Sequence, residues 1–149
     1  ERLNSTICKN NDDSMFVTVW FGIYTISTGK VVAANAGHEY PIIKHADRGF
    51  EILKDRHGFV IGGMSGLKYR DYEFVLEPGD ALFLYTDGVP EATDAEGNMY
   101  GTQNMLETLN RVSDSSARSL LEAVHQDVER FVGNAPQFDD LTMLALKHT

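Results

Sequence analysis

Residues 15–27, MFVTVWFGIYTIS, decide the fold class, because apolar side chains fill both alternating sets of positions in this stretch. Val19 and Ile23 fall on one side of an extended strand and Trp20 falls on the other. An antiparallel strand with one solvated face would alternate apolar and polar residues instead. Residues 141–146, LTMLAL, are also largely apolar on both sides. We therefore expect strands that are buried on both faces.

Two amphipathic helices are predicted in the C-terminal half of the chain. Residues 102–112, TQNMLETLNRV, and residues 116–133, SARSLLEAVHQDVERFVG, each place their apolar side chains along one stripe. The Ser/Asp cluster at 113–116 offers N-caps for the second helix, and Gly133 offers its C-terminal end. Helices with one apolar stripe and strands buried on both faces pack as layers. The prediction is an α+β fold, an α/β/β/α sandwich of two antiparallel sheets flanked by helices, with residues 1–149 forming a single domain.

Further strands are expected in the middle of the chain, where runs of β-branched and aromatic residues are separated by turn signals. The first strands, following one another along the chain, indicate an antiparallel meander. Residues 61–66, IGGMSG, carry three glycines and form a loop, and residues 77–80, EPGD, fit a type II turn. The additional strand segments are 30–40, 41–46, 50–54, 69–76 and 81–85.

Charge and cysteine content exclude several classes of protein. The chain has 149 residues with 13 Lys and Arg against 22 Asp and Glu, a net charge of −9, and no basic run. Nucleic-acid binding and attraction to anionic membranes both depend on clustered Lys and Arg, so neither is expected. No apolar run approaches the ~20 residues of a membrane-spanning helix. The single cysteine, Cys8, excludes an internal disulfide and fits a reducing compartment, and it is expected to pack rather than react.

Acidic side chains stand at the ends of two apolar strands. Asp87 follows the strand 81–85 in the stretch 80–92, DALFLYTDGVPEA, and Asp139 with Asp140 precedes the last strand. Two carboxylates about 4 Å apart would repel by about 4 kcal/mol at an effective dielectric constant of 20, and a divalent cation would turn that repulsion into attraction. Oxygen ligands without Cys or clustered His favour Mg²⁺ or Mn²⁺ over Zn²⁺. An ordinary Asp-Gly turn and an Asp cap before a strand remain alternative interpretations.

Six short motifs occur in an order that carries a family resemblance. They are MFVT at 15–18, NAGHEYP at 35–41, PGD at 78–80, YTDGVPEA at 85–92, YG at 100–101 and FDDLTML at 138–144. Together they resemble the SpoIIE/RsbU branch of the PPM (PP2C-like) serine/threonine phosphatases, which are metal-dependent. The resemblance covers nearly the whole chain and implies the same α/β/β/α sandwich.

The resemblance implies roles for individual residues. In the family, two Mn²⁺ or Mg²⁺ ions activate a water that attacks the phosphorus of phosphoserine or phosphothreonine. Asp87 and Asp139 match metal ligands, and Asp140 would orient Asp139. Gly88 would permit the tight departure from the strand. Glu91 matches a position that can reach an accessory metal, and a solvated loop residue is the alternative there.

The histidines and the glycine loop allow a functional and a structural interpretation. His38 follows Ala-Gly near a strand end, so it is either a general acid or a hydrogen-bonded residue that fixes the 37–41 turn. The loop 61–66 lacks the lysine of a phosphate-binding loop and is expected to be a flexible connection. The other histidines lack a partner pattern and are expected on the surface; they are His45, His57, His125 and His148.

An earlier family block, which contains the aspartate that bridges the two metals, has no match before Met15. Residues 1–14 resemble the tail of a preceding helix and a polar loop, so the chain is expected to be N-terminally truncated, partly incomplete in its fold, and weakly active or inactive alone.

For the intact protein, the resemblance implies a bacterial cytoplasmic regulator. Its substrate would be a phosphorylated STAS-type anti-anti-sigma protein, and a sensor or receiver domain would lie upstream. Neither nucleic acid nor direct membrane insertion is expected, and an exposed sheet edge would allow a homodimer. The alternatives are a non-catalytic PP2C-like binding or regulatory module, and a metal-binding regulatory domain without phosphatase chemistry.

Overall fold

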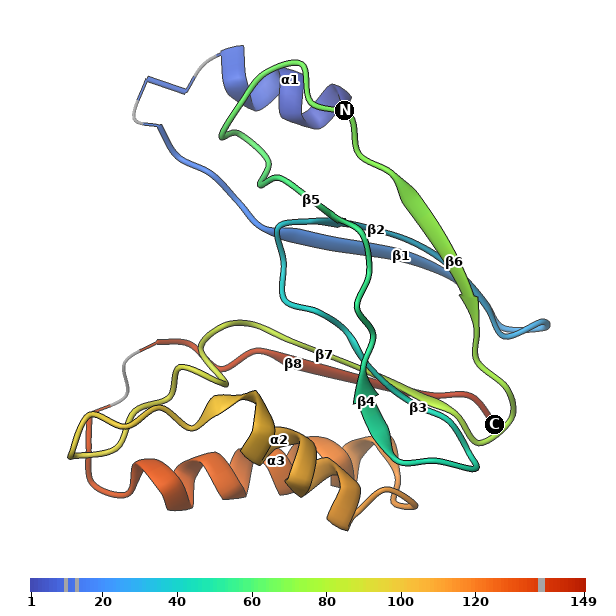
Figure 1. Ribbon diagram of the computed structural model, residues 1–149, viewed down its shortest axis with the longest axis vertical. Coiled ribbons are helices and arrows are strands. Elements are labelled where there is room, and N and C mark those ends of the chain that lie inside the picture. The colour runs from blue at the N-terminus through green and yellow to red at the C-terminus, as the bar shows by residue number, and fades with distance from the viewer. Residues whose placement is uncertain (10, 13, 137–138) are drawn as a thin grey trace. The chain divides into compact units, whose positions relative to one another are not determined.

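The computed structural model describes residues 1–9, 11–12, 14–136 and 139–149 (Figure 1). The chain forms two compact units. Unit 1 comprises Glu1–Tyr40 and Lys54–Val75, and unit 2 comprises Pro41–Leu53 and Leu76–Thr149. Each unit contains its own sheet, and the single domain expected for residues 1–149 stays a prediction. No helix among the described residues is both long and apolar enough to cross a membrane.

Unit 1 contains a short helix and a four-stranded sheet built around β2. Along its whole length β2 pairs antiparallel with β1, while its other edge pairs antiparallel with β6 and then parallel with β5. The two-residue strand β5 was not predicted, and its parallel pairing is an exception to the predicted antiparallel sheets. The elements of this unit are α1 (Arg2–Lys9), β1 (Val19–Thr25), β2 (Lys30–Ala36), β5 (His57–Gly58) and β6 (Asp71–Val75).

The expected burial of both faces is wrong for β1. Phe21 is 62% exposed and Ile23 is 59% exposed in the described chain. The helix α1 is anchored to the glycine loop instead of covering these side chains. The fully buried Asn4 accepts a hydrogen bond from the amide of Gly62 at 2.8 Å and donates one to the carbonyl of Met64 at 2.9 Å. The glycine loop therefore holds the helix through its backbone groups.

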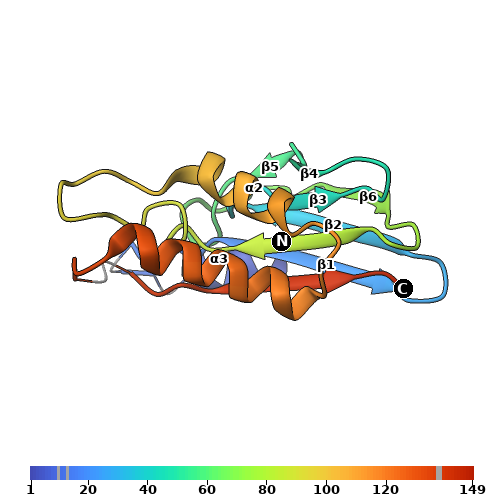
Figure 2. The ribbon, with the colours of Figure 1, turned by 90° about the horizontal axis from the view of Figure 1, so that it is seen from below.

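Unit 2 contains an antiparallel sheet in the order β4-β3-β7-β8, with α2 and α3 on one face (Figures 1 and 2). Fully buried side chains from the sheet, such as Phe83, pack with those of the helices, such as Leu109 and Leu120. The apolar stripes predicted for the two helices are thus the ones that face the core. The elements are β3 (Ile42–Lys44), β4 (Phe50–Ile52), β7 (Ala81–Tyr85), α2 (Gly101–Arg111), α3 (Ala117–Val132) and β8 (Met143–Lys147).

Local signals in unit 2 fix the ends of its elements as predicted. The hydroxyl of Ser116 accepts a hydrogen bond from the amide of Ser119 at the start of α3. Gly133 ends that helix with a φ of 60°. In the turn before β7, Gly79 has a φ of 95° and the amide of Asp80 donates to the carbonyl of Glu77, as a type II turn requires.

The predicted meander of consecutive strands is wrong. The hairpin of β1 and β2 belongs to unit 1, whereas the hairpin of β3 and β4 belongs to unit 2. The chain leaves β2 at Gly37, which has a φ of 75°, and the side chain of Asn35 accepts a hydrogen bond from the amide of His38. After this turn the next strand along the chain, β3, joins the sheet of unit 2 and does not pair with β2.

Asp127 is the polar hub between α2 and α3. Its carboxylate accepts hydrogen bonds from the Tyr100 hydroxyl at 2.8 Å and the Thr108 hydroxyl at 2.7 Å, and it pairs with Arg111 and Arg130. Burial raises the pKa of Asp127, but the hydrogen bonds from Thr108, Tyr100 and Arg111 outweigh it and hold the pKa below its usual value. Burial and the bond to Asp127 raise the pKa of Tyr100 to about 12, so its hydroxyl stays a donor.

The lowered pKa of Asp127 predicts an acid-sensitive contribution to stability. A carboxyl group with a lowered pKa in the folded state stabilises the fold above its unfolded pKa of ~3.9, and loses that effect as the pH falls through the folded value. We expect Asp127→Asn to lower the free energy of unfolding at pH 7 by about 1–3 kcal/mol. The variant should also show a flatter pH dependence below about pH 4, measured by urea unfolding at several pH values.

The matched control is Glu122→Gln, which removes an exposed carboxylate from the same helix. It should leave the acid limb of the stability profile unchanged. An Asp127→Asn variant with the wild-type pH dependence would contradict the assignment of this hub.

Candidate metal centre

The pairing of β7 with β8 brings the two predicted acids to one place. Tyr85, the last residue of β7, pairs with Met143, the first residue of β8. The ladder continues one step further, because the amide of Thr86 donates to the carbonyl of Thr142 at 3.0 Å. The residue after Thr86 is Asp87, so its backbone lies beside the segment that precedes β8.

Gly88 packs directly against that segment. A methyl group at this buried position would collide with the carbonyl oxygen of Asp140 and would lie 3.5 Å from the Cβ of Asp139. Gly88 is not among the glycines with positive φ, so the tight departure expected there is not what requires it. The requirement is the close approach of two backbones, which only glycine allows.

Backbone amides hold the carboxylates of Asp87 and Asp139. Asp87 Oδ1 accepts from the amide of Gly88 at 3.0 Å, and Asp139 Oδ1 accepts from the amide of Asp140 at 2.7 Å. Both aspartates are exposed, so their charged forms keep contact with water. Asp140 thus touches Asp139 through its backbone, and its orienting role stays a prediction.

Thr86 is a site residue that the sequence interpretation missed. Its hydroxyl accepts from the amide of Thr142 at 3.3 Å and donates to the carbonyl of Asp140 at 3.4 Å. These contacts tie the turn after β7 to the segment before β8. A threonine in a turn often bonds neighbouring backbone in this way, and its place directly before Asp-Gly was the available signal.

A third acid does not join Asp87 and Asp139 in the described part of the chain. Residues 1–9, 11–12, 14–136 and 139–149 contain no group of three or more His, Cys, Asp or Glu side chains placed to hold one ion. Glu91 is exposed, and its amide donates to the carbonyl of Asp87 at 2.9 Å. Its accessory role stays a prediction. Phe138, which opens the FDDLTML motif, lies outside the described residues.

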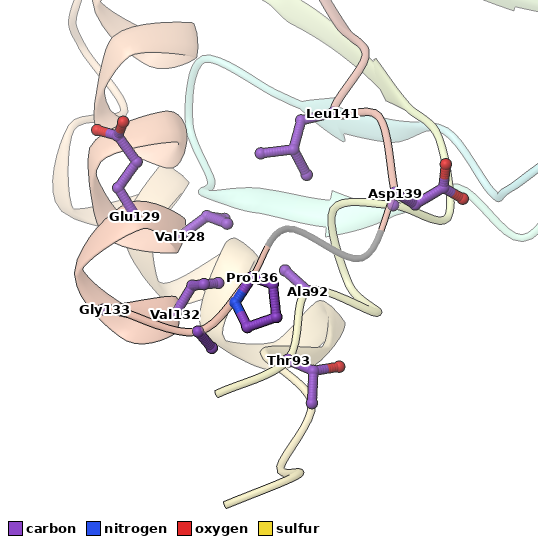
Figure 3. A pocket seen from close by; sticks show the side chains of 11 residues that line it. Ala92, Thr93, Val128, Glu129, Val132, Gly133, Pro136, Asp139 and Leu141 are labelled. Atoms are coloured by element: carbon purple, nitrogen blue, oxygen red, sulfur yellow. The ribbon is translucent and has the colours of Figure 1, made fainter. Parts of the chain in front are cut away.

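The cavity nearest these acids has a volume of about 240 Å³ and is lined partly by Val128, Val132 and Pro136 (Figure 3). The carboxylate of Asp139 points away from these three residues (Figure 3). The charged oxygens of Asp139 therefore do not face the apolar part of this cavity. Oxygen donors at a solvated strand end suit Mg²⁺ or Mn²⁺, so the donor chemistry of Asp87 and Asp139 fits the predicted ions.

His38 belongs to unit 1, whereas both acids belong to unit 2. Its backbone amide donates to Asn35 Oδ1 at 2.8 Å, and its carbonyl accepts from Asn35 Nδ2 at 3.0 Å. Its ring Nδ1 lies 3.2 Å from the hydroxyl oxygen of Thr18. These contacts fix the turn after β2, and a direct part of His38 in chemistry stays a prediction.

At least three of the remaining histidines, which show no partner pattern in the sequence, have an acidic partner in the structure. His45 Nδ1 lies 3.3 Å from the buried carboxylate of Asp80, and His57 Nδ1 lies 2.7 Å from Asp55. His125 lies 3.4 Å from Glu129, one helical turn away in α3. Helical spacing indicates only the last of these pairs, since Asp80 lies outside the helices and strands and far from His45 in the sequence, and Asp55 lies in the loop just before β5.

A family model and two curated proteins match the chain. The family model described as stage II sporulation protein E (SpoIIE) matches residues 1–149. Protein IcfG of Synechocystis sp. is 31% identical over 138 residues, which are 93% of this chain and 22% of that protein. Phosphoserine phosphatase RsbU of Bacillus subtilis is 26% identical over 148 residues, which are 99% of this chain and 43% of that protein. The chain thus spans less than half the length of these curated relatives.

Solved structures show the same fold. The RsbU and RsbW domains of Rv1364c from Mycobacterium tuberculosis give a TM-score of 0.74 at 24% identity, covering 96% of this chain and 39% of that one. The Mn-presoaked phosphatase domain of SpoIIE from Bacillus subtilis gives a TM-score of 0.67 at 15% identity, covering 93% of this chain and 58% of that one. Two sheets with helices that match PP2C-like domains confirm the predicted α+β fold class.

The close approach at Gly88 predicts the effect of adding a methyl group there. Gly88→Ala should displace the 139–140 segment and lower the free energy of unfolding by about 1–3 kcal/mol, as overpacking does. In heteronuclear NMR spectra the amide signals of Asp139, Asp140 and Thr142 should shift. Gly97→Ala is the control: Gly97 has a φ of 85° and open space around it, so this change strains the backbone without touching the segment. Unmoved signals of the segment in Gly88→Ala would contradict the close approach.

Proposed function

Because the chain belongs to the SpoIIE family, the SpoIIE/RsbU-type branch of the PPM (PP2C-like) phosphatase domains, we propose that it supplies two metal ligands of a protein serine/threonine phosphatase. The observation that carries the proposal is the packing of Gly88 against Asp139 and Asp140. This packing places the acid that follows β7 beside the acid that precedes β8. Two carboxylates held in this way repel each other unless a cation lies between them.

We assign Mn²⁺ or Mg²⁺ to this place, with Asp87 and Asp139 as ligands. Support comes from the donor set, which offers oxygen atoms only, and from the related SpoIIE phosphatase domain, whose crystals were presoaked with Mn. When bound, a divalent ion pair supplies a nucleophilic water at neutral pH and positive charge for the phosphoryl oxygens.

The chain's own residues hold and orient these carboxylates. The amides of Gly88 and Asp140 each donate to one carboxylate oxygen, which fixes the rotation of the side chain. The hydroxyl of Thr86 ties the two supporting segments together. The preorganised acids therefore need little rearrangement to accept a cation.

The proposed substrate is a phosphoserine or phosphothreonine on a regulatory STAS-type protein. The sequence relative RsbU is itself a phosphoserine phosphatase. The solved relative Rv1364c combines RsbU and RsbW domains, which favours a regulatory setting. A bacterial cytoplasmic location, an upstream sensor or receiver domain and a homodimer stay expectations from the sequence.

Metal binding by the 149-residue chain should be measurable and weak, because its described part contains no group of three or more His, Cys, Asp or Glu side chains placed to hold one ion. We expect Asp87→Asn and Asp139→Asn each to lower the affinity for Mn²⁺ at least about tenfold, measured by calorimetry. Asp47→Asn removes an exposed carboxylate elsewhere in unit 2 and should bind Mn²⁺ like the wild type. Equal affinities in all four proteins would contradict the assigned ligands.

Phosphatase activity should depend on the same two acids. In the intact protein with Mn²⁺, Asp87→Asn and Asp139→Asn should each lower the rate of phosphate release from a phosphoserine peptide by about 10²-fold or more. The 149-residue chain alone should release phosphate slowly or not at all.

The alternative, a non-catalytic binding or regulatory module, predicts a different result. It draws support from the number of candidate ligands. The described residues contain no group of three or more His, Cys, Asp or Glu side chains placed to hold one ion, whereas a catalytic two-metal site needs several ligands. An intact protein that binds Mn²⁺ through both acids but releases no phosphate would favour the module over the enzyme.

A further inference from the structure

A basic hollow lies in unit 1. It has a volume of about 300 Å³ and is lined by Arg56, His57, Gly58, Lys68 and Arg70. Arg56, Lys68 and Arg70 are exposed and carry permanent positive charge at neutral pH. We refer to this hollow, with its four cationic or titratable side chains, as the basic pocket.

Positive side chains in so acidic a chain would be expected to find carboxylate partners. Among the described residues, six of the thirteen Lys and Arg side chains lie within 4.0 Å of a carboxylate oxygen: Lys30, Lys44, Arg48, Arg111, Arg118 and Arg130. Within the part of the chain that the structure describes, Arg56, Lys68 and Arg70 form no such pair. Three uncompensated cations around one hollow repel one another, and an anion between them would relieve that repulsion.

The backbone creates this hollow where the edge of β2 changes partner. Ala34 in β2 pairs with Asp71 of β6, and the next residue, Asn35, pairs with His57 of β5. The segment before β6 must therefore diverge from β2 at Arg70. Tyr69 fills part of the space, since a methyl group on Gly58 would lie 2.8 Å from its ring.

The side chain of Tyr69 packs on Gly58, whereas those of its neighbours Lys68 and Arg70 line the pocket. Side chains at successive positions of an extended segment point to opposite sides. With Tyr69 packed on Gly58 and its hydroxyl donating to the carbonyl of Val60, Lys68 and Arg70 are left to line the pocket together. The aromatic ring thus fixes the segment that carries two of the charges.

The carboxylate of Asp55, which precedes Arg56 in the chain, already has partners of its own. The Asp55 side chain is fully buried and accepts hydrogen bonds from the Tyr72 hydroxyl at 2.7 Å and from Asn35 Nδ2 at 3.0 Å. Its Oδ1 has no hydrogen bond among the described residues and lies 2.7 Å from His57 Nδ1. Burial and the bond to Asp55 raise the pKa of Tyr72, which keeps its hydroxyl a donor.

The second ring nitrogen of His57 also faces an oxygen. His57 Nε2 lies 2.6 Å from the carbonyl oxygen of His38, an atom that only accepts hydrogen bonds. The ring of His57 thus lies against Asp55 and the carbonyl of His38, and neither contact involves Arg56, Lys68 or Arg70.

We propose that the basic pocket binds a phosphate-class dianion, either free inorganic phosphate or the phosphoryl group of a monoester. Guanidinium groups donate paired hydrogen bonds that match phosphoryl oxygens, and the ammonium of Lys68 adds a third charge. The net charge of −9 repels anions from the chain as a whole, so only a local concentration of positive charge can hold one. The pocket does not depend on the proposed phosphatase function, since it lies in unit 1 and needs no metal.

The test is a set of anion titrations of the 149-residue chain followed by NMR at constant ionic strength. The probes are inorganic phosphate, O-phosphoserine, acetate and chloride, and the reporters are the amides of Gly58, Tyr69 and Arg70. We expect saturable shifts at these amides with inorganic phosphate or O-phosphoserine, but not with acetate or chloride. The double variant Arg56→Gln with Arg70→Gln should bind at least about tenfold more weakly, because two charge-assisted hydrogen bonds are lost.

Arg118→Gln is the matched control, since it removes an exposed arginine from α3 in unit 2 and should leave the titrations unchanged. Tighter binding of O-phosphoserine would assign the pocket to a phosphoryl ester, and tighter binding of inorganic phosphate would assign it to the free ion. The proposal is overturned if acetate or chloride produces the same shifts, if no anion saturates, or if a folded double variant binds like the wild type. Unchanged thermal unfolding of the double variant establishes that it is folded.

Discussion

The antiparallel pairing of β7 with β8 is the constraint on which the candidate site depends. It joins residues more than fifty positions apart in the chain and sets which backbone follows each strand end. The ladder stops after Thr86 and Thr142, and the two segments then come so close that only glycine fits at position 88. Each amide that follows an acid in this place is turned toward its carboxylate. The two charges are therefore positioned by backbone geometry, which is stiffer than side-chain packing alone.

Much of unit 2 was predictable because its signals are local. Helical stripes, the Ser116 cap, the Gly133 end and the Glu-Pro-Gly-Asp turn each need only a few consecutive residues to be recognised. Asp87 and Asp139 were singled out in the same way, as acids at the ends of apolar strands, and the family resemblance assigned them to one site, an assignment that stays a prediction. The structure adds the reason why Gly88 stands between them, which no local pattern contains.

The other features of the fold and of unit 1 could not be predicted, because they depend on contacts between segments that are distant in the sequence. Apolar residues on both sides of β1 indicated two buried faces, yet Phe21 and Ile23 are mostly exposed, since hydrophobicity does not specify what covers a strand. The meander failed because the Asn35 turn sends the chain to another sheet. The gathering of Arg56 with Lys68 and Arg70 follows from the partner change along β2, and a two-residue strand such as β5 leaves no pattern in the sequence from which that change could be predicted.

The most direct test of the central claim is a map of Mn²⁺-induced relaxation in NMR spectra of the labelled chain. A paramagnetic ion broadens the signals of the amides nearest to it. If Asp87 and Asp139 share an ion, substoichiometric Mn²⁺ should broaden the amides of Gly88 and Asp140 together and before any others. Broadening that begins at other acidic positions, such as the turn of Asp94, or that reaches only one of the two segments, would contradict the shared site.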